Sequence, residues 1–420
     1  MLYGRLYTGR GIVSVVSMTT RLAWRARVAV GCVVTVNYFS RRLGRGAGTV
    51  AGGRVGLALE PRLLRALTRS RTVVLVSGTN GKTTTSALLR AGWGDDVAGN
   101  VTGANMPAGH VAALATSRAT RVVLETDEAW LPSVLADADP AVVVLLNLSR
   151  DQLDRANEVR QLAQRWRDCL AAPQFTGVVV ANSNDPLVVF AAQASERVRW
   201  VDVPTPWRGD AGSCPHCTRA LDFADRGWSC ACGFAQPTPP TATLREELHF
   251  SSQSFRLDLA VPGMFNEVNA ALATVALVEL GQDPGEALAR MRRLDTIQGR
   301  YGLRRFGERT VRLMLAKNPA GATALLESLS EGEVWIAINA QIADGKDPSW
   351  LYDVPFGVLR GRRVRCLGER RLDLATRLTY AGVQCEVSDD VDALRRGTDD
   401  VTVVANYTAF REWLARTAPC

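Results

Sequence analysis

The residues Val73–Ser86 (VVLVSGTNGKTTTS) decide the fold of this chain. The first four are apolar and mostly β-branched, a pattern that predicts a buried parallel strand. A turn with Gly78 and Gly81 follows, and the residues after this turn favour a helix. Backbone N–H groups at such a helix start lie at the positive end of its dipole, where they bind phosphate. The stretch therefore predicts a strand, a phosphate-binding loop and a helix.

The side chains of this loop suit a nucleoside triphosphate. Lys82 supplies a cation for the β- and γ-phosphates, and the Thr83 hydroxyl is a ligand for Mg²⁺. The usual pattern has an additional glycine where this chain has Val76. The alternative is an ordinary strand-to-helix turn with an exposed lysine. We predict an ATP site that includes Gly78, Thr79, Asn80, Gly81, Lys82, Thr83 and Thr84.

Apolar strand candidates alternate with helical segments over residues 72–205. This alternation predicts an α/β domain with a doubly wound parallel sheet and a ligand site at the carboxyl ends of its strands. One strand ends in Glu125, where a carboxylate beside the phosphate loop would hold Mg²⁺. The alternative for Glu125 is an exposed acidic turn. After the strand at Val73–Val76, the predicted strands are Val122–Glu125, Val142–Leu146, Val178–Ala181 and Val198–Val203.

Four of the nine cysteines lie in two close pairs, and no secretory signal precedes them. Two such pairs on separate turns are typical of a closed, structural Zn²⁺ site, whereas the alternative is a loop with free thiols. Residues rich in proline and glycine flank the pairs, so we expect a zinc-ribbon insertion over residues 207–237. Unpaired thiols favour a reducing, cytoplasmic location. The predicted ligands are Cys214, Cys217, Cys230 and Cys232.

The positive charge is concentrated at the N-terminus. Residues 1–71 hold thirteen arginines and one acid, Glu60, a balance of +12; because the whole chain carries +8, the remainder carries −4. We therefore expect a basic N-terminal segment over residues 1–45 and no general binding of nucleic acid. Arg21–Arg45 either lies against anionic lipid headgroups or forms a helix packed on the body. Met18 is an alternative start to Met1, and Gly44–Gly53 is predicted to be a linker or turn region.

The loop wording GTNGKTT (Gly78–Thr84) resembles the Mur ligases of cell-wall peptide synthesis and their folylpolyglutamate synthase relatives. The segment NLSRDQLD (Asn147–Asp154) is similar to a Mur-ligase motif, with Gln152 in place of its histidine. The resemblance implies that Glu125 binds Mg²⁺ and that an acyl phosphate forms from ATP. It also implies nucleotide contacts from Asn266, Asn269 and Arg300.

The cysteine pairs, Gln152 and the Asp344–Trp350 loop together resemble one branch of that family, the ligase-like subunit of lipid II isoglutaminyl synthase. This implies ATP-dependent amidation of the α-carboxyl of D-isoglutamate in the lipid II stem peptide. None of the three histidines lies in a glutaminase-like context, so ammonia would come from a separate GatD-like glutaminase. The resemblance implies that Asp347 completes the Cys–His pair of that partner; the alternative is a turn-capping aspartate. Trp350 is expected to be exposed in this contact loop.

These expectations divide the chain into a central ATP-binding domain over residues 46–302 and a C-terminal α/β domain over residues 303–420. Two other functions stay open. One is a stand-alone ligase that adds an amino acid or polyglutamate and needs no second protein. The other is a nucleotide-binding scaffold without catalysis. Peripheral contact with the inner face of the membrane is a further expectation.

Overall fold

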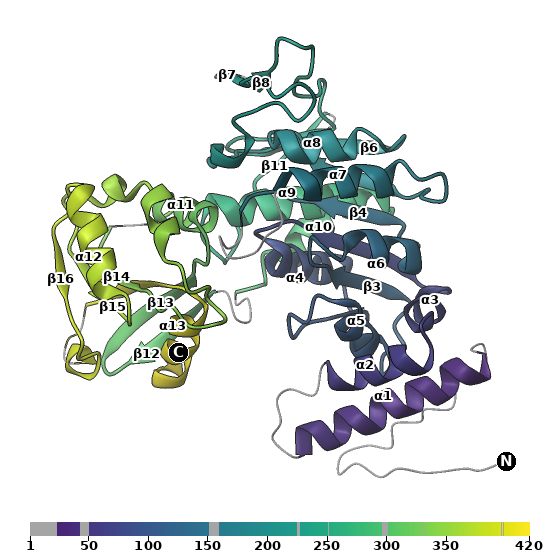
Figure 1. Cartoon of the computed structure of the whole chain (residues 1–420), viewed down its shortest axis with the longest axis horizontal. Helices are drawn as coiled ribbons and strands as arrows, with labels where there is room; N and C mark the ends of the chain where they lie inside the picture. The colour runs from purple at the N-terminus through teal and green to yellow at the C-terminus, as the bar shows by residue number, and fades with distance from the viewer. Residues whose placement is uncertain are drawn as a thin grey trace.

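The computed structural model describes residues 23–42, 50–150, 159–224, 227–250, 252–295, 301–329, 331–395, 397 and 399–420. Two α/β bodies lie side by side, each built on its own sheet (Figure 1). The predicted site residues Gln152 and Arg300 lie outside the described residues. Among the described helices, none has the length and hydropathy that crossing a bilayer requires.

The central body holds a nine-stranded sheet in the order β11-β10-β9-β6-β5-β4-β1-β3-β2. In this sheet the seven neighbouring strands β9, β6, β5, β4, β1, β3 and β2 run parallel, and β10 and β11 add an antiparallel edge. The predicted parallel α/β sheet is thus confirmed. The strands are β1 (Thr72–Ser77), β2 (Val97–Gly99), β3 (Arg121–Glu125), β4 (Val142–Leu145), β5 (Val178–Asn182), β6 (Val198–Asp202), β9 (Ala242–Leu244), β10 (Leu248–Phe250) and β11 (Gln253–Phe255).

Alternate residues of β1 enter two separate cores because side chains of a strand point to opposite faces. Val73 and Leu75 pack with α5, α6, α7 and α8, whereas Val74 and Val76 pack with α4, α9 and α10. Both faces are therefore covered, which is why the strand has no polar alternation. The helices are α4 (Lys82–Trp93), α5 (Pro107–Leu114), α6 (Leu131–Ala138), α7 (Val159–Leu170), α8 (Pro186–Ala192), α9 (Met264–Glu279) and α10 (Pro284–Met291).

Three N-terminal helices, α1 (Trp24–Arg42), α2 (Ala51–Leu59) and α3 (Leu63–Thr68), pack beside α5 at one end of this body (Figure 1). A Cβ on Gly53 would lie 1.8 Å from the Ala108 carbonyl oxygen, so only glycine permits this approach of α2 to α5. The prediction of a linker over Gly44–Gly53 is wrong for its last residues, because Gly52 and Gly53 are buried inside α2.

The C-terminal body holds a seven-stranded sheet in the order β16-β15-β14-β17-β13-β12-β18. Its helices are α11 (Pro319–Glu327), α12 (Arg371–Tyr380) and α13 (Tyr407–Arg416), with 3-10 turns η3 (Ser349–Asp353), η4 (Phe356–Leu359) and η5 (Asp392–Arg395). The strands are β12 (Tyr301–Phe306), β13 (Arg309–Leu315), β14 (Glu333–Ala337), β15 (Val364–Leu367), β16 (Cys385–Val387), β17 (Val401–Ala405) and β18 (Ala418–Pro419).

Trp350 was expected on the surface, and this is wrong. Its side chain is 8% exposed and belongs to the core under η3 and η4, beside Leu351 and Phe356. The loop still faces solvent, but through other residues: Ile342 is 88% exposed and Tyr352 is 62% exposed. The indole therefore stabilises the loop from beneath.

A small hairpin, β7 (Asp222–Ala224) and β8 (Gly227–Ser229), stands between β6 and β9 in the sequence, after the 3-10 turn η2 (Gly209–Ala211). It projects from the end of the central body opposite α1 (Figure 1). Trp228 of β8 is buried and donates from Nε1 to the Ser183 carbonyl, 3.1 Å away, at the turn after β5. The hairpin is therefore attached to the central body at the carboxyl end of β5.

Candidate nucleotide-binding site

The loop between β1 and α4 bends at two glycines with positive φ, +146° at Gly78 and +88° at Gly81. L-residues with a Cβ rarely adopt these angles. A Cβ on Gly81 would also lie 2.4 Å from Oδ1 of Asn269, so the missing side chain lets α9 approach the loop. The register of the sheet places the ends of β3 and β4 beside the same loop, since Val76 pairs with Glu125 and Ser77 with Leu145.

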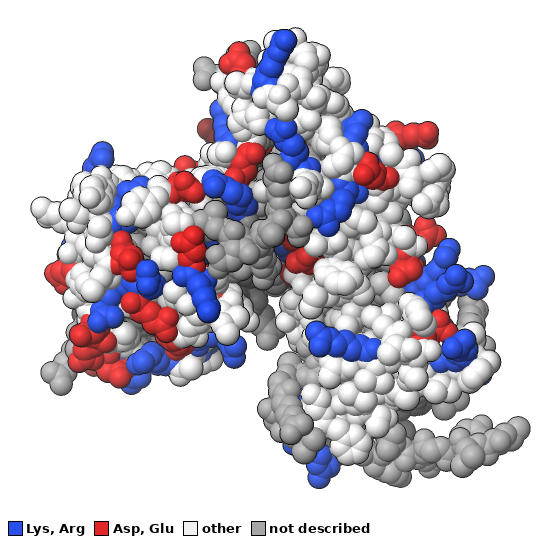
Figure 2. All heavy atoms as spheres, in the orientation of Figure 1, with Lys and Arg blue, Asp and Glu red and all other residues white. Residues whose placement is uncertain are grey.

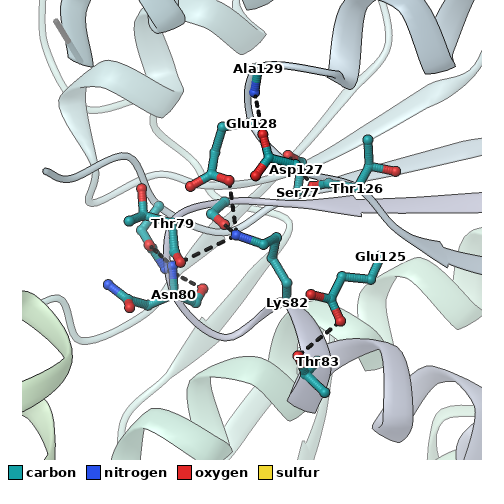
Figure 3. A network of polar contacts seen from close by, with 12 residues as sticks. Ser77, Thr79, Asn80, Lys82, Thr83, Glu125, Thr126, Asp127, Glu128 and Ala129 are labelled. Atoms are coloured by element: carbon teal, nitrogen blue, oxygen red, sulfur yellow. Dashed lines mark hydrogen bonds and ion pairs between the residues drawn. The ribbon is translucent and has the colours of Figure 1, made fainter. Parts of the chain in front are cut away.

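Lys82 is folded back over the loop by a buried ion pair (Figure 3). Its Nζ lies 2.9 Å from Oε2 of Glu128 and donates to the Gly78 carbonyl at 2.6 Å. Both side chains of the ion pair are less than one-tenth exposed. We did not predict Glu128, although it lies in the same acidic turn as Glu125. A phosphate that approaches the loop would compete with Glu128 for the ammonium group.

Two side chains with oxygen atoms that can bind a metal ion, Thr83 and Glu125, meet at the first turn of α4. The Thr83 hydroxyl donates to Oε2 of Glu125 over 2.9 Å (Figure 3). The Glu125 backbone is held by Asn100, which accepts from its N–H at 2.9 Å and donates to its carbonyl at 2.8 Å. A hydroxyl and a carboxylate at this spacing fit Mg²⁺, which prefers oxygen ligands. Thr83 and Glu125 are thus the residues that could hold the ion.

The buried imidazole of His110 also supports Glu125. Its Nε2 lies 2.8 Å from the Glu125 carbonyl oxygen, and burial lowers the pKa of His110 to about 4. The ring is therefore neutral at pH 7 and donates from Nε2 to this carbonyl. The role of His110 is to position the end of β3.

The other side of the loop is held by asparagines from two other segments. Asn147, just after β4, accepts from the Asn80 N–H at 2.9 Å and donates to its carbonyl at 3.0 Å. Asn318 of the C-terminal body caps α11 and donates to Oδ1 of Asn80 at 3.1 Å. Nothing local to the turn of Asn318 indicates this contact, because the two residues are 238 positions apart. The phosphate loop therefore lies where the two bodies meet.

A cavity of about 500 Å³ opens over this loop and extends between the bodies. Its volume is within the range of small-molecule sites. The predicted residues Gly78 and Glu125 do not line it. The predicted residues that line it are Thr79, Asn80, Gly81, Lys82, Thr83, Thr84, Asn266 and Asn269; others include Asp185, Trp207, Arg208, Tyr301, Lys317 and Gly321.

The Asn266 side chain lies inside α9 and donates to the Pro262 carbonyl at 2.7 Å, while Gly263 occupies the N-cap. Asn266 therefore does not cap α9. Asp185 caps α8 and accepts from the Leu148 N–H at 2.8 Å. Burial raises the pKa of Asp185 to about 6. These two buried polar groups line the same cavity from opposite elements.

The four predicted thiols form a cluster in which all sulfurs lie within 4.8 Å of one another. The Cys214–Cys232 and Cys217–Cys230 sulfurs are 3.6 and 3.4 Å apart. In a tetrahedral Zn²⁺ site with bonds of about 2.3 Å, the sulfurs are about 3.8 Å apart, so this set fits zinc. His216 points away from the cluster, because its ring packs on Phe190 and Phe234 and its Nε2 contacts Gln193.

Asp347 does not join the nucleotide cavity. It is exposed on the loop after β14, and its Oδ1 accepts from the Ser349 N–H at 2.8 Å, at the start of η3. The neighbouring Asp344 is buried and accepts from the N–H and hydroxyl of Thr408. Of the two acids of the loop, Asp347 is therefore the one that another molecule can reach.

Arg150 connects the cavity rim to that segment. It follows β4, and its backbone N–H donates to Oδ2 of Asp210 at 3.0 Å. Its Nη2 lies 3.3 Å from Oδ2 of Asp353, the last residue of η3. The pair is half-exposed, so its stabilisation is small, but it aligns the two bodies at this edge of the site.

Comparison with known proteins shows two matching protein domains. The Mur ligase middle domain matches residues 76–205, and the MurT ligase C-terminal domain matches residues 315–410. The first match covers the phosphate loop and the strands from β2 to β6, and the second covers most of the C-terminal sheet. The chain therefore contains a Mur ligase middle domain and a MurT ligase C-terminal domain.

Relatives of one kind match nearly the whole chain. It is 28% identical to "Lipid II isoglutaminyl synthase (glutamine-hydrolyzing) subunit MurT" of Staphylococcus aureus, over 89% of this chain and 94% of the relative. It is 27% identical to the subunit of the same name in Streptococcus pneumoniae, over 89% and 93%. The MurF ligase of Thermotoga maritima in complex with ADP shares the fold, with a TM-score of 0.59, 15% identity and coverage of 86% and 83%.

Proposed function

We propose that this chain is the ligase-like subunit of a lipid II isoglutaminyl synthase. In this proposal it amidates the α-carboxyl of D-isoglutamate in the lipid II stem peptide, with ATP and with ammonia from a separate GatD-like glutaminase. The observation that carries the proposal is the match to MurT subunits over 89% of the chain, through both bodies. Other Mur ligases share the middle domain, whereas the C-terminal match is to MurT.

The nucleotide site supports the first half of this reaction. A carboxylate oxygen of the substrate attacks the γ-phosphorus of ATP, the bond to the β-phosphate oxygen breaks, and ADP leaves with an acyl phosphate formed. Lys82 and the loop N–H groups would neutralise charge on the phosphates. Thr83 and Glu125 would hold Mg²⁺, which supplies further charge stabilisation when bound. Asn266 and Asn269, at the start of α9, would contact the nucleotide, and Arg300 is proposed for the same role.

The second half needs a nitrogen nucleophile. Ammonia attacks the acyl carbon and inorganic phosphate leaves, so the carboxyl becomes a carboxamide. Glutamine hydrolysis uses a cysteine nucleophile and a histidine base. Across the described residues, none of the three histidines hydrogen-bonds to a thiol: their partners are Glu125, Gln193 and Ser254. This supports a second subunit as the source of ammonia, as does the word "subunit" in the names of the relatives.

Asp347 is proposed to act toward that partner. Its carboxylate is exposed, is fixed by the Ser349 N–H, and stands on a loop with the exposed apolar residues Ile342 and Tyr352. A carboxylate that orients a partner histidine raises the basicity of the imidazole and stabilises the imidazolium. The exposed side chains around it would form the contact.

The cysteine cluster is proposed to hold a structural Zn²⁺ in a ribbon over residues 207–237. Four thiolates leave no open coordination position for chemistry. The ribbon contacts the sheet edge through Trp228 and through Gln236, whose Nε2 lies 3.3 Å from the Ser183 hydroxyl. Its role would be to stabilise the turn that precedes Asp185. All nine cysteines are free of disulfides, which supports a cytoplasmic location.

The experiment is co-expression with a candidate glutaminase, followed by mass spectrometry of lipid II incubated with ATP, Mg²⁺ and glutamine labelled at its amide nitrogen. The proposal expects the heavy nitrogen in the stem-peptide carboxamide, only when both proteins are present. Amidation by this chain alone with glutamine would contradict it, as would incorporation of a whole amino acid. Lys82→Ala is the matched inactive control.

Asp347→Asn separates the two half-sites. We expect glutamine-dependent amidation to fall by at least a hundredfold, in the range seen when a residue that orients a catalytic histidine is changed. Amidation with added ammonium chloride should persist, because the nucleotide cavity is untouched. Asp373→Asn, an exposed acid of α12, is the matched control. Full glutamine-dependent activity in Asp347→Asn would refute this role while leaving the ligase reaction standing.

A further inference from the structure

Helix α1 exposes its largest apolar side chains and buries its small ones. Trp24 is 72% exposed, Phe39 55%, Val28 54% and Tyr38 40%. The face turned to the body consists of Ala26, Ala29, Val30, Val33 and Asn37. A helix that only packed against its own protein would bury the aromatic rings and leave small or polar residues outside.

The exposed apolar residues form one stripe. At 100° per residue, Trp24, Val28, Tyr38 and Phe39 fall within about 100° of one another, with Gly31 and Thr35 between them. Exposed arginines border this stripe on both sides: Arg25 on one, Arg27 and Arg41 on the other, and Arg42 at the end. The result is a helix with an aromatic outer face and a rim of fixed positive charge.

The surroundings of α1 are also basic. Within the described residues up to position 71 there are nine arginines and one acid, Glu60. The visible face in Figure 2 carries acidic and basic side chains close together over the C-terminal body, whereas basic and uncharged residues predominate over α1. Asp137 lies near Arg62 and Arg65 and offsets part of their charge. Among the described residues no ion pair involves an arginine of α1, so the field at this helix attracts anions.

The stripe is held in place by close packing behind it. The Gly52 N–H donates to Oδ1 of the buried Asn37 at 3.1 Å, and a Cβ on Gly56 would lie 2.4 Å from Cγ2 of Val33. Helix α2 therefore presses against α1 at its glycines, and α1 cannot turn its aromatic residues inward without breaking these contacts. The outer face is a fixed feature of the fold.

We infer that the outer face of α1 docks on an anionic phospholipid surface, with the helix lying in the plane of the membrane. Tryptophan, tyrosine and phenylalanine rings enter the headgroup region, and the arginines beside them contact lipid phosphates while their stems cover the apolar boundary. A nucleic acid would satisfy the arginines but would leave the aliphatic Val28 and the continuous apolar stripe unused. This inference goes beyond the proposed function and does not rest on it.

The test is co-sedimentation of the full chain with vesicles of phosphatidylcholine alone or mixed with phosphatidylglycerol, without lipid II. We expect binding only to the anionic vesicles, weakening as salt rises. The triple variant Arg25→Glu/Arg27→Glu/Arg41→Glu should lower the partition coefficient by about tenfold or more. Trp24→Ser/Phe39→Ser should lower it at constant charge. The control Arg118→Glu/Arg293→Glu/Arg305→Glu reverses three exposed arginines elsewhere.

The thermal midpoint of each variant should equal that of the parent, since every changed side chain is exposed. Equal sedimentation with neutral and anionic vesicles would overturn the inference, and so would unchanged binding of the α1 variants. Binding to a DNA duplex that exceeds vesicle binding and survives Trp24→Ser/Phe39→Ser would assign the surface to nucleic acid and also overturn it. None of these outcomes depends on whether the protein amidates lipid II.

Discussion

Replacing Glu128 by glutamine should destabilise the protein without nucleotide and strengthen its response to nucleotide. The Lys82 ammonium lies 2.9 Å from the Glu128 carboxylate, with both side chains buried. At that distance two unit charges attract by about 6 kcal/mol for an effective dielectric constant of about 20. Part of this attraction offsets the desolvation of the two ions. Removing one partner of a buried pair typically costs about 3–5 kcal/mol.

The amide of Glu128→Gln can still accept a hydrogen bond from Lys82, so we expect a loss of about 2–4 kcal/mol in the free energy of unfolding of the central body. A triphosphate supplies the missing negative charge. The lysine no longer has to leave a carboxylate to reach a phosphate, so the variant should bind ATP more tightly. The stabilisation that ATP gives should therefore be larger in the variant than in the parent.

The assay is the thermal midpoint of parent and variant over a series of ATP concentrations with Mg²⁺, together with direct titration of ATP. Glu196→Gln, at an exposed site of the same body, is the matched control and should change neither quantity. An unchanged midpoint without nucleotide would refute the ion pair as a stabilising contact. Weaker ATP binding in Glu128→Gln would show that Glu128 serves the nucleotide and does not compete with it.

Three further predictions concern the loop, the thiols and His110. Gly81→Ala should weaken ATP binding by at least tenfold in a titration, because its Cβ would clash with the Asn269 side chain. The control Gly103→Ala also lies at positive φ, but open space surrounds it. It should cost only the backbone strain of about 1–2 kcal/mol and leave ATP binding unchanged. Cys230→Ser should lose bound zinc, measured by elemental analysis, and expose residues 207–237 to protease, because metal binding supplies about 10 kcal/mol or more of folding free energy; Cys385→Ser should keep both. The pKa of His110 is lowered to about 4 in the folded protein, so below pH 6.5 the unfolded chain binds a proton at this residue and the folded chain does not. The free energy of unfolding should therefore fall by up to about 3 kcal/mol between pH 6.5 and pH 4. His110→Gln should flatten this part of the pH profile of the thermal midpoint.

Local patterns in the sequence predicted the first strand, the glycine turn after it and the thiol cluster. Val73–Val76 is apolar throughout because both faces of β1 are buried, and this pattern is visible in four residues. Gly78 and Gly81 are required by backbone angles that other residues avoid, so their role is also local. Cysteine spacing predicted the thiol cluster, since each pair lies on one short turn.

Contacts between distant segments could not be predicted in this way. Glu128 pairs with Lys82 because the parallel register of β1 and β3 places two turns together. Asn318 reaches Asn80 only because the two bodies meet at the cavity. Trp350 is buried by η3 and η4, which no property of its own loop indicates.

Helix α1 shows most clearly what the sequence alone determined and what only the tertiary structure decided. Its sequence determined a basic, aromatic segment that could either face lipid or pack on the body. The tertiary structure decided which face is buried: α1 packs on the body through small residues and keeps its aromatic rings exposed. The physical reason is the close approach of Gly52 and Gly56, which leaves room for alanine and valine behind α1 and none for tryptophan or phenylalanine. Which side of a helix is buried depends on the surface it meets, and that surface is made by residues elsewhere in the chain.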